Sequence, residues 1–292
     1  MMMSRLGIAL LWLIHGLPLG MQAMIGNGLG MLLYWLAVPR RRIGATNLAL
    51  CFPDMTDRQR RTLLRQHFQA VSRAALEHGI LWWSSAARVN RIVRFEGLEH
   101  LQAAYGQPLI LLAPHFVGLD MGGIRISTEF HPLVSMYSRL KNPHFDRLML
   151  YARTRFGQSR LFSRHEGVRP LITEIKRGLP LYYLPDQDFG AKDAVFAPFF
   201  GIPTATVNAL PRLARLTGAR IVPAVTRQLA GGQGYVVRFY PAWQDFPTAD
   251  LDADVARMNA FIEARVRENP AQYFWLHKRF KTRPPGAPSL YH

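Results

Sequence analysis

The 292-residue chain is poor in cysteine, lysine and acidic residues. Its one cysteine, Cys51, excludes an intramolecular disulfide and a cysteine-rich zinc module. Only five of the 36 basic residues are lysines, so 31 are arginines. The chain has 19 acidic residues. The net charge of +17 predicts an anionic partner, which could be nucleic acid, an anionic membrane, a phosphorylated substrate or an acidic protein.

Motifs of nucleotide and metal sites are missing as well. The sequence contains no GxGxxG, no GKS or GKT, and no HxxH or HxxxH. We therefore expect no metal and no other cofactor. The apolar fraction of 49% and the charged fraction of 19% exclude a disordered chain.

Charged residues are absent from Leu6 to Val38, a run that ends at the cluster Arg40–Arg42. A membrane-spanning helix needs about 20 apolar residues, so the run could hold one span, although Pro18 and several glycines interrupt it. A hairpin in one leaflet and a buried helical hairpin of a soluble core are the other readings. A cleaved signal peptide fits poorly, because only Arg5 precedes an apolar stretch that is too long.

The arginine cluster suits the cytoplasmic face of a membrane. We therefore divide the chain into an N-terminal membrane anchor with its basic flank, residues 1–42, and a globular domain, residues 43–292. The mean hydropathy of −0.01 fits a globular body with a limited membrane attachment.

The globular part reads as alternating strands and helices. A capped amphipathic helix is expected over 56–83, and after residue 90 short apolar runs alternate with helical patterns. The GGQG turn at 231–234 predicts a hairpin, 250–268 a helix, and 271–280 a last helical turn or two. This order predicts an α/β fold with a mostly parallel central sheet and helices on both faces. Ligands of such sheets lie beyond the carboxyl ends of the strands.

One candidate site directly follows the apolar run at 108–114. There His115 and Asp120 form an H-x4-D pattern. A histidine titrates near neutral pH and can take a proton from a hydroxyl, while a carboxylate on its other ring nitrogen fixes the tautomer. The two side chains meet only if His115 lies on the turn and Asp120 one turn into the following helix. Otherwise both are ordinary surface or core residues.

A second candidate site follows the apolar run at 179–185, where Asp186 and Asp188 stand. Two acids at a strand end could orient a basic side chain or a substrate hydroxyl, or they could form a polar turn. Between the two candidate sites lie arginines that could be solvated individually or form an anion cradle as a group, namely Arg139, Arg147, Arg153, Arg155, Arg160, Arg164 and Arg169.

Seven segments carry a resemblance that covers nearly the whole chain. They are NLALCFP at 47–53, HFVGLD at 115–120, YSRLKNP at 137–143, RTRFG at 153–157, YLPDQDFG at 183–190, FAPFFG at 196–201 and PAQYFWLHKRFK at 270–281. Together and in this order they resemble the bacterial lipid A biosynthesis acyltransferase family, the late lauroyl and myristoyl transferases. Leu140 departs from the family pattern, which often has a proline there.

The resemblance implies an acyltransferase domain at 43–292, held at the cytoplasmic face of the bacterial inner membrane. It implies an O-acyltransferase that moves a fatty acyl chain from the acyl carrier protein thioester to a hydroxyl of a Kdo-bearing lipid A precursor. His115 would be the general base and Asp120 its catalytic partner. The expected substrate-binding residues are Arg139, Asn142, Arg153, Asp186 and Asp188. The expected partners are acyl carrier protein, the lipid A precursor and anionic membrane lipids.

Two other readings compete with this one. An acyl-CoA-dependent acyltransferase of lysophospholipids or glycolipids would use the same H-x4-D geometry. A basic membrane-anchored module that binds nucleic acid or acidic lipid would not need acids and a histidine at strand ends, and no nucleic-acid-binding motif is visible. We therefore expect no nucleic acid partner.

Overall fold

The computed structural model describes residues 2–130, 132–163 and 166–291, and its centre is a seven-stranded sheet. The strand order is β1-β9-β8-β2-β5-β3-β4, and every neighbouring pair is parallel except β8 and β9. The mostly parallel sheet that the sequence predicts is therefore confirmed. The strands are β1 (Val93–Glu96), β2 (Leu109–Leu112), β3 (Val134–Tyr137), β4 (Arg160–Ser163), β5 (Leu181–Tyr183), β8 (Arg220–Gln228) and β9 (Tyr235–Phe239).

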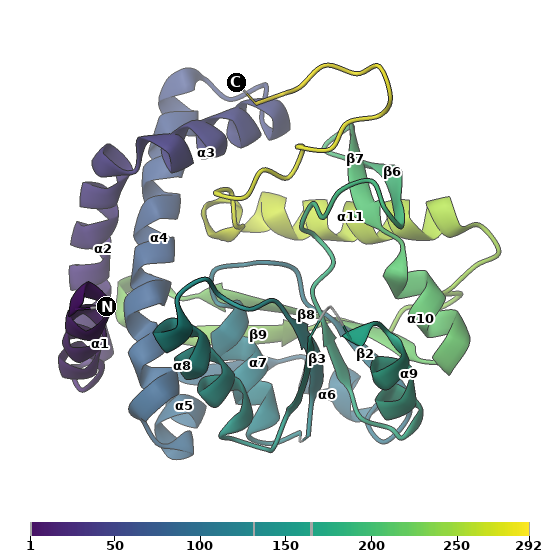
Figure 1. Ribbon diagram of the computed structural model, residues 1–292, viewed down its shortest axis with the longest axis horizontal. Coiled ribbons are helices and arrows are strands. Elements are labelled where there is room, and N and C mark those ends of the chain that lie inside the picture. The colour runs from purple at the N-terminus through teal and green to yellow at the C-terminus, as the bar shows by residue number, and fades with distance from the viewer. Residues whose placement is uncertain (1, 131, 164–165, 292) are drawn as a thin grey trace.

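Helices cover both faces of the sheet, as expected (Figure 1). Alternate residues of a strand point to opposite faces, and all four residues of β2 are buried. Ile110 and Leu112 belong to the core under α11 (Leu251–Glu268), which also includes α9 (Arg169–Lys176) and α10 (Ala209–Thr217). Leu109 and Leu111 belong to a second core, formed with α4 (Asp57–Trp83), α5 (Ala86–Ile92), α6 (Leu98–Gln102), α7 (Leu119–Ser127) and α8 (Pro143–Thr154).

The long helix α4 connects the N-terminal helices to the sheet (Figure 1). It begins at the predicted residue, since the Thr56 hydroxyl accepts a hydrogen bond from the Gln59 amide, and the Gln59 side-chain oxygen accepts one from the Thr56 amide. Helices α1 (Met2–His15), α2 (Leu19–Leu36) and α3 (Val38–Cys51) precede it. The apolar run is thus two helices broken near Pro18, and the arginine cluster lies inside a third helix.

Glycines explain why α2 lies so close to α4. A Cβ atom on Gly26 would come 2.6 Å from the Cα of Arg73, and one on Gly30 would come 2.5 Å from the Cα of Gln69. These two glycines therefore permit a backbone contact that no larger residue allows. Gly28, on the other side of the helix, meets nothing within 4 Å.

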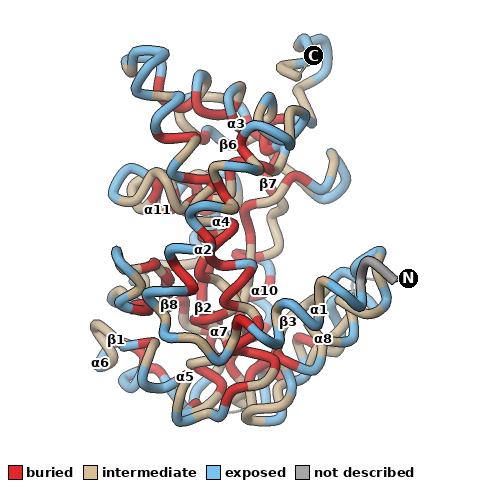
Figure 2. Tube along the Cα trace, turned by 90° about the vertical axis from the view of Figure 1, so that its left-hand side faces the viewer, coloured by how far each residue is buried: buried red, intermediate tan, exposed pale blue. Residues whose placement is uncertain are grey.

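The outer faces of α1 and α2 carry most of the exposed large apolar side chains, and Figure 2 shows how much of α1 lies outside the buried core. Among the described residues, no single helix is long and apolar enough to cross a membrane, whereas α2 and α3 together meet that test across a bend of 93°. The exposed side chains are Leu6, Leu10, Trp12, Leu13, Met21, Met24, Ile25, Leu32, Trp35 and Leu36.

Two segments differ from the sequence expectations. The segment expected to be helical at 271–280 has only the short 3-10 helix η3 (Pro270–Gln272), after which Tyr273 forms a β-bridge with Phe116. A separate antiparallel pair, β6 (Ala194–Phe199) and β7 (Ile202–Val207), was not expected. The hairpin of β8 and β9, joined through η2 (Ala230–Gly232), is confirmed.

Candidate active site

His115 and Asp186 meet at one edge of the sheet. Strands β2 and β5 are parallel neighbours. His115 lies three residues after the end of β2, and Asp186 lies three residues after the end of β5. The Nδ1 atom of His115 lies 2.7 Å from Oδ1 of Asp186, and the His115 amide donates to both carboxylate oxygens at 3.1 and 3.0 Å. Asp186 is buried, so the pair fixes the orientation of the imidazole.

Asp120 has different partners from those that the motif predicts. It lies in the first turn of α7, as expected, but its Oδ1 accepts from Arg153 Nε at 2.9 Å and its Oδ2 lies 3.2 Å from His78 Nε2. No hydrogen bond or ion pair joins His115 to Asp120, both of which lie in the described part of the chain. The first turn of α7 directs Asp120 toward α4 and α8, and Asp186 takes the place expected for it beside His115.

His78 lies between two hydrogen-bond acceptors. Its Nδ1 lies 2.7 Å from the Ala74 carbonyl oxygen and its Nε2 lies 3.2 Å from the Asp120 carboxylate, so both ring nitrogens face acceptor atoms. Burial alone would lower the pKa of His78, but the hydrogen bond and charge of Asp120 outweigh it and raise that pKa. Burial would likewise raise the pKa of Asp120, yet the charge of Arg153 and the contact with His78 hold it well below its usual range.

The pKa of Asp186 is also lowered. Burial would raise it, and the charge and hydrogen bonds of His115, together with the charge of Arg279, more than offset that effect. Asp186 is therefore ionised at neutral pH and keeps the proton of the imidazole on Nδ1.

The C-terminal segment clamps the loop that carries His115. The Phe274 amide donates to the His115 carbonyl oxygen at 2.9 Å, and the Val117 amide donates to the Gln272 carbonyl oxygen at 2.9 Å. Tyr273 lies between them and pairs with Phe116. This segment belongs to the region expected to be helical, and its extended form is what holds the loop in place.

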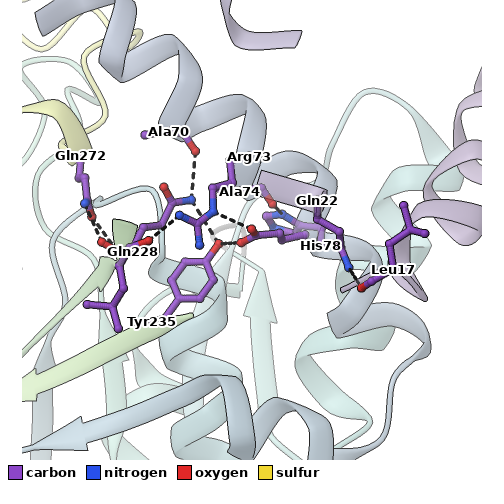
Figure 3. Close-up of polar contacts among 11 residues, drawn as sticks. Leu17, Gln22, Ala70, Arg73, Ala74, His78, Gln228, Tyr235 and Gln272 are labelled. Carbon is purple, nitrogen blue, oxygen red and sulfur yellow. Dashed lines mark hydrogen bonds and ion pairs between the residues drawn. The ribbon is translucent and has the colours of Figure 1, made fainter. Parts of the chain in front are cut away.

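A buried polar network extends from this segment to α4, and Figure 3 shows it. Gln272 and Gln228 exchange two hydrogen bonds, at 2.7 and 2.9 Å, and Gln228 Nε2 reaches the Tyr235 hydroxyl at 3.2 Å. The Tyr235 hydroxyl donates to Glu77, which also binds Arg73 Nε at 2.6 Å. Because Glu77 precedes His78 on α4, the network fixes the helix that carries His78.

A cavity of about 330 Å³ opens beside His115. Arg153 also lines it, together with Tyr182. Apolar side chains make up most of the rest of the wall, including Met136, Met149, Leu150, Leu181, Leu184 and Val207. A largely apolar cavity with a few convergent polar groups is typical of a small-molecule site.

Of the predicted site residues, His115 and Arg153 line this cavity, Asp186 and Asp120 bind them without lining it, and three more lie outside its wall. Asn142 caps α8, since its side chain accepts from the His144 and Phe145 amides. Arg139 is exposed at the rim, between the lining residues Ser138 and Leu140. The carboxylate of Asp188 is buried and accepts from the backbone and hydroxyl of Thr282 at 2.6 and 2.7 Å, so it holds the C-terminal segment.

The arginine group does not gather into one cradle. Among the described arginines of this group, only Arg153 lines the cavity beside His115. Arg155 donates to carbonyl oxygens at the end of α4, and Arg160 pairs with Glu174 at 2.7 Å. Arg147 and Arg169 are exposed, and Arg164 lies outside the described residues.

Two histidines of the site were not predicted. His78 stands beside Glu77 within an apolar stretch of α4, and this pair of charges on a buried helix face was its only signal in the sequence. His277 Nε2 accepts from the Asp188 amide at 2.9 Å, and burial, followed by the charge of Arg279, lowers the pKa of His277 to about 4. No group of three or more His, Cys, Asp or Glu side chains that could hold a metal occurs among the described residues.

Comparison with known proteins gives one family for the whole chain. Residues 1–282 match the family described as Bacterial lipid A biosynthesis acyltransferase. The lipid A biosynthesis lauroyltransferase of Escherichia coli strain K12 is 34% identical over 292 residues, which cover 99% of this chain and 94% of that protein. The palmitoleoyltransferase of the same organism is 32% identical over 98% of this chain and 93% of its own. The corresponding myristoyltransferase is 31% identical, over 84% and 76% of the two chains. The chain therefore belongs to the bacterial lipid A biosynthesis acyltransferase family.

Proposed function

We propose that the protein transfers a fatty acyl chain from the thioester of acyl carrier protein to a hydroxyl of a Kdo-bearing lipid A precursor. The family supports acyl transfer in lipid A biosynthesis. The observation that carries the proposed chemistry is the hydrogen-bonded pair His115–Asp186, in which His115 lines a largely apolar cavity. Such a cavity suits an alkyl chain, and the imidazole suits removal of a hydroxyl proton.

His115 acts as the general base in this proposal. Asp186 keeps the proton on Nδ1, so Nε2 is left with a lone pair for the acceptor hydroxyl. The hydroxyl oxygen attacks the thioester carbonyl and its proton passes to Nε2. When the tetrahedral intermediate collapses, the carbon–sulfur bond breaks and the imidazolium returns the proton to the leaving thiolate. A base of this kind contributes about 10²–10⁴ in rate.

Arg153 is the donor that we assign to the oxyanion of the intermediate. The Phe116 amide already donates to the Pro114 carbonyl oxygen at 2.7 Å, and the Val117 amide donates to Gln272. The Arg153 guanidinium lines the cavity that holds His115, and Asp120 fixes it through Nε and Nη2 at 2.9 and 2.8 Å. In this assignment Asp120 is a positioning residue, and a prepositioned cation stabilises the developing negative charge.

The surface fits a membrane setting on the cytoplasmic side of the inner membrane. The exposed apolar side chains of α1 and α2 supply an area that an apolar phase would cover. The basic cluster Arg40–Arg42 follows directly in α3, where it would meet anionic headgroups. The net charge of +17 also favours an acidic carrier protein and a phosphorylated acceptor.

A matrix of donors and acceptors tests the proposed function. Purified protein in detergent is mixed with either acyl carrier protein thioesters or acyl-CoA, and with either a Kdo-bearing lipid A precursor or a lysophospholipid. Mass spectrometry then detects the gain of one acyl group. We expect the gain with the carrier protein thioester and the lipid A precursor. A gain confined to acyl-CoA and lysophospholipid would overturn the proposed donor and acceptor.

A further inference from the structure

A second, smaller cavity of about 60 Å³ adjoins the cavity of His115. It lies between α7 and strands β3, β4 and β5, and the Arg153–Asp120 ion pair forms part of its wall. The two cavities share four lining residues, namely Met136, Arg153, Tyr182 and Leu184. The two cavities therefore meet at these four residues.

Apart from the ion pair, the wall of the small cavity offers mostly apolar groups. Ile124, Leu133 and Leu161 contribute alkyl side chains. The hydroxyl of Ser127 donates to the Ile124 carbonyl oxygen at 2.8 Å, and the hydroxyl of Ser135 donates to the Tyr182 carbonyl oxygen at 3.0 Å. Both donors are thus already used by the backbone.

Ser159 is the exception, because its buried hydroxyl has no hydrogen-bond partner among the described residues. An ordered water needs two to four polar partners, and away from the ion pair this hydroxyl is the remaining polar group of the wall. Away from the ion pair, the small cavity therefore suits hydrocarbon better than water.

Gly123 of α7 leaves room for the small cavity beside that helix. A Cβ atom at this position would lie 3.0 Å from Cε1 of Tyr182, and the Tyr182 hydroxyl is fixed by its 3.0 Å bond to the Leu119 carbonyl oxygen. Ser127 lies one helical turn further along the same face of α7 and is small as well. The size of the residues on this face thus sets the volume of the cavity.

We infer that the small cavity binds the terminal methylene groups of the donor acyl chain, and that Ile124 and Ser127 of α7 set the preferred chain length. The inference rests on the proposed function, because it takes the thioester carbonyl to lie beside His115. An accessible volume of 60 Å³ has room for roughly four groups of the size of water or methylene. Each methylene that fits changes kcat/KM about fourfold.

Two opposite substitutions test this assignment. Ser127→Leu fills the cavity, so we expect the ratio of kcat/KM for long over short saturated donors to fall by about tenfold or more. Ile124→Ala enlarges the cavity, so we expect the preference to move toward longer donors. Thr217→Leu on α10 is the matched control, because Thr217 is also a buried helical residue whose hydroxyl binds a backbone carbonyl and it lines neither cavity.

The assay varies the donor chain with one acceptor, and then the acceptor chains with one donor. A shift of donor preference in opposite directions for the two variants, with Thr217→Leu unchanged, supports the assignment. Unchanged donor preference in a folded, active Ser127→Leu or Ile124→Ala protein overturns it, and so does a shift confined to the acceptor chains. If the unsubstituted protein acylates none of the acceptors, the proposed function fails, and that result is distinct from an altered chain preference.

Discussion

The carboxylate that orients His115 comes from Asp186, which is 71 residues away, and not from Asp120 at the start of the following helix. The parallel pairing of β2 and β5 brings the two residues together, because both strands end at the same edge of the sheet. Asp120 is instead shared by two basic side chains, His78 and Arg153. The two aspartates therefore serve different groups, and each assignment is open to a separate test.

The His115–Asp186 assignment predicts a coupled loss of rate. In Asp186→Asn the carboxylate that fixes the imidazole tautomer is gone, and we expect kcat to fall by about 10²–10⁴. His115→Ala should cost a similar factor, and the double variant should be little worse than either, because the two residues act as one unit. Steady-state rates of the four proteins measure this, and additive losses would contradict the pairing.

The Asp120–Arg153 assignment predicts a second, separate unit. Asp120→Asn weakens the positioning of the guanidinium, so its effect on kcat should be largely absent from an Arg153→Ala background. The effect of Asp120→Asn on the activation free energy should add in full to that of Asp186→Asn. If the loss from Asp120→Asn disappears instead in a His115→Ala background, then Asp120 acts on the base after all.

The raised pKa of His78 predicts that its contribution to stability decreases as the pH rises. Its pKa is raised in the folded protein, so its contribution is complete below the unfolded value of about 6.5 and is lost as the pH rises through the folded value. The free energy of unfolding of the unsubstituted protein should exceed that of His78→Gln most at mildly acidic pH. Denaturant titrations across neutral pH measure the difference, which should shrink at alkaline pH.

His67 predicts the opposite sign. It is fully buried, and burial lowers its pKa to about 4 although its Nδ1 lies 2.9 Å from the Ala271 carbonyl oxygen. Unfolding frees it to bind a proton, so its contribution to stability is lost as the pH falls from about 6.5 toward 4. His67→Gln should flatten the pH dependence of the melting temperature in this window. An unchanged slope would show that His67 does not titrate on unfolding.

The glycines of α2 predict a contrast on one helix. Gly30→Ala places a methyl group against the α4 backbone, and we expect a loss of about 1–3 kcal/mol in the free energy of unfolding. Gly28→Ala enters open space in a helix and should be neutral or stabilising by up to about 1 kcal/mol. Thermal unfolding in detergent compares the two, and equal effects would mean that α2 does not pack on α4 as described.

Much of the fold was predictable because local patterns decide it. The capping residue Thr56, the alternation of apolar runs with helical patterns, and the GGQG turn each correspond to a described element. The segment after Gln272 was not, because its extended form depends on pairing with Phe116, which lies far away in the sequence. Glycines at 26 and 30 suggested an interruption in α2, whereas the structure uses them for close packing on α4.

The candidate site was predictable at the level of residue types and strand ends. His115 and Asp186 could be singled out because each follows an apolar run, but strand order decides that they meet, and single-sequence patterns do not contain it. His78 was missed because a titratable residue on an amphipathic helix resembles any other polar position. Asp188 was assigned to the substrate, but its contacts with Thr282 arise from a loop packing that spacing does not reveal.

The most direct test of the account is the rate of acyl transfer by His115→Asn. The side-chain amide of asparagine can still donate a hydrogen bond to Asp186, as Nδ1 does, but offers no nitrogen that accepts a proton. We predict a loss of about 10²–10⁴ in kcat with a melting temperature close to that of the unsubstituted protein. Transfer at an undiminished rate by this variant would contradict the claim that His115 is the base.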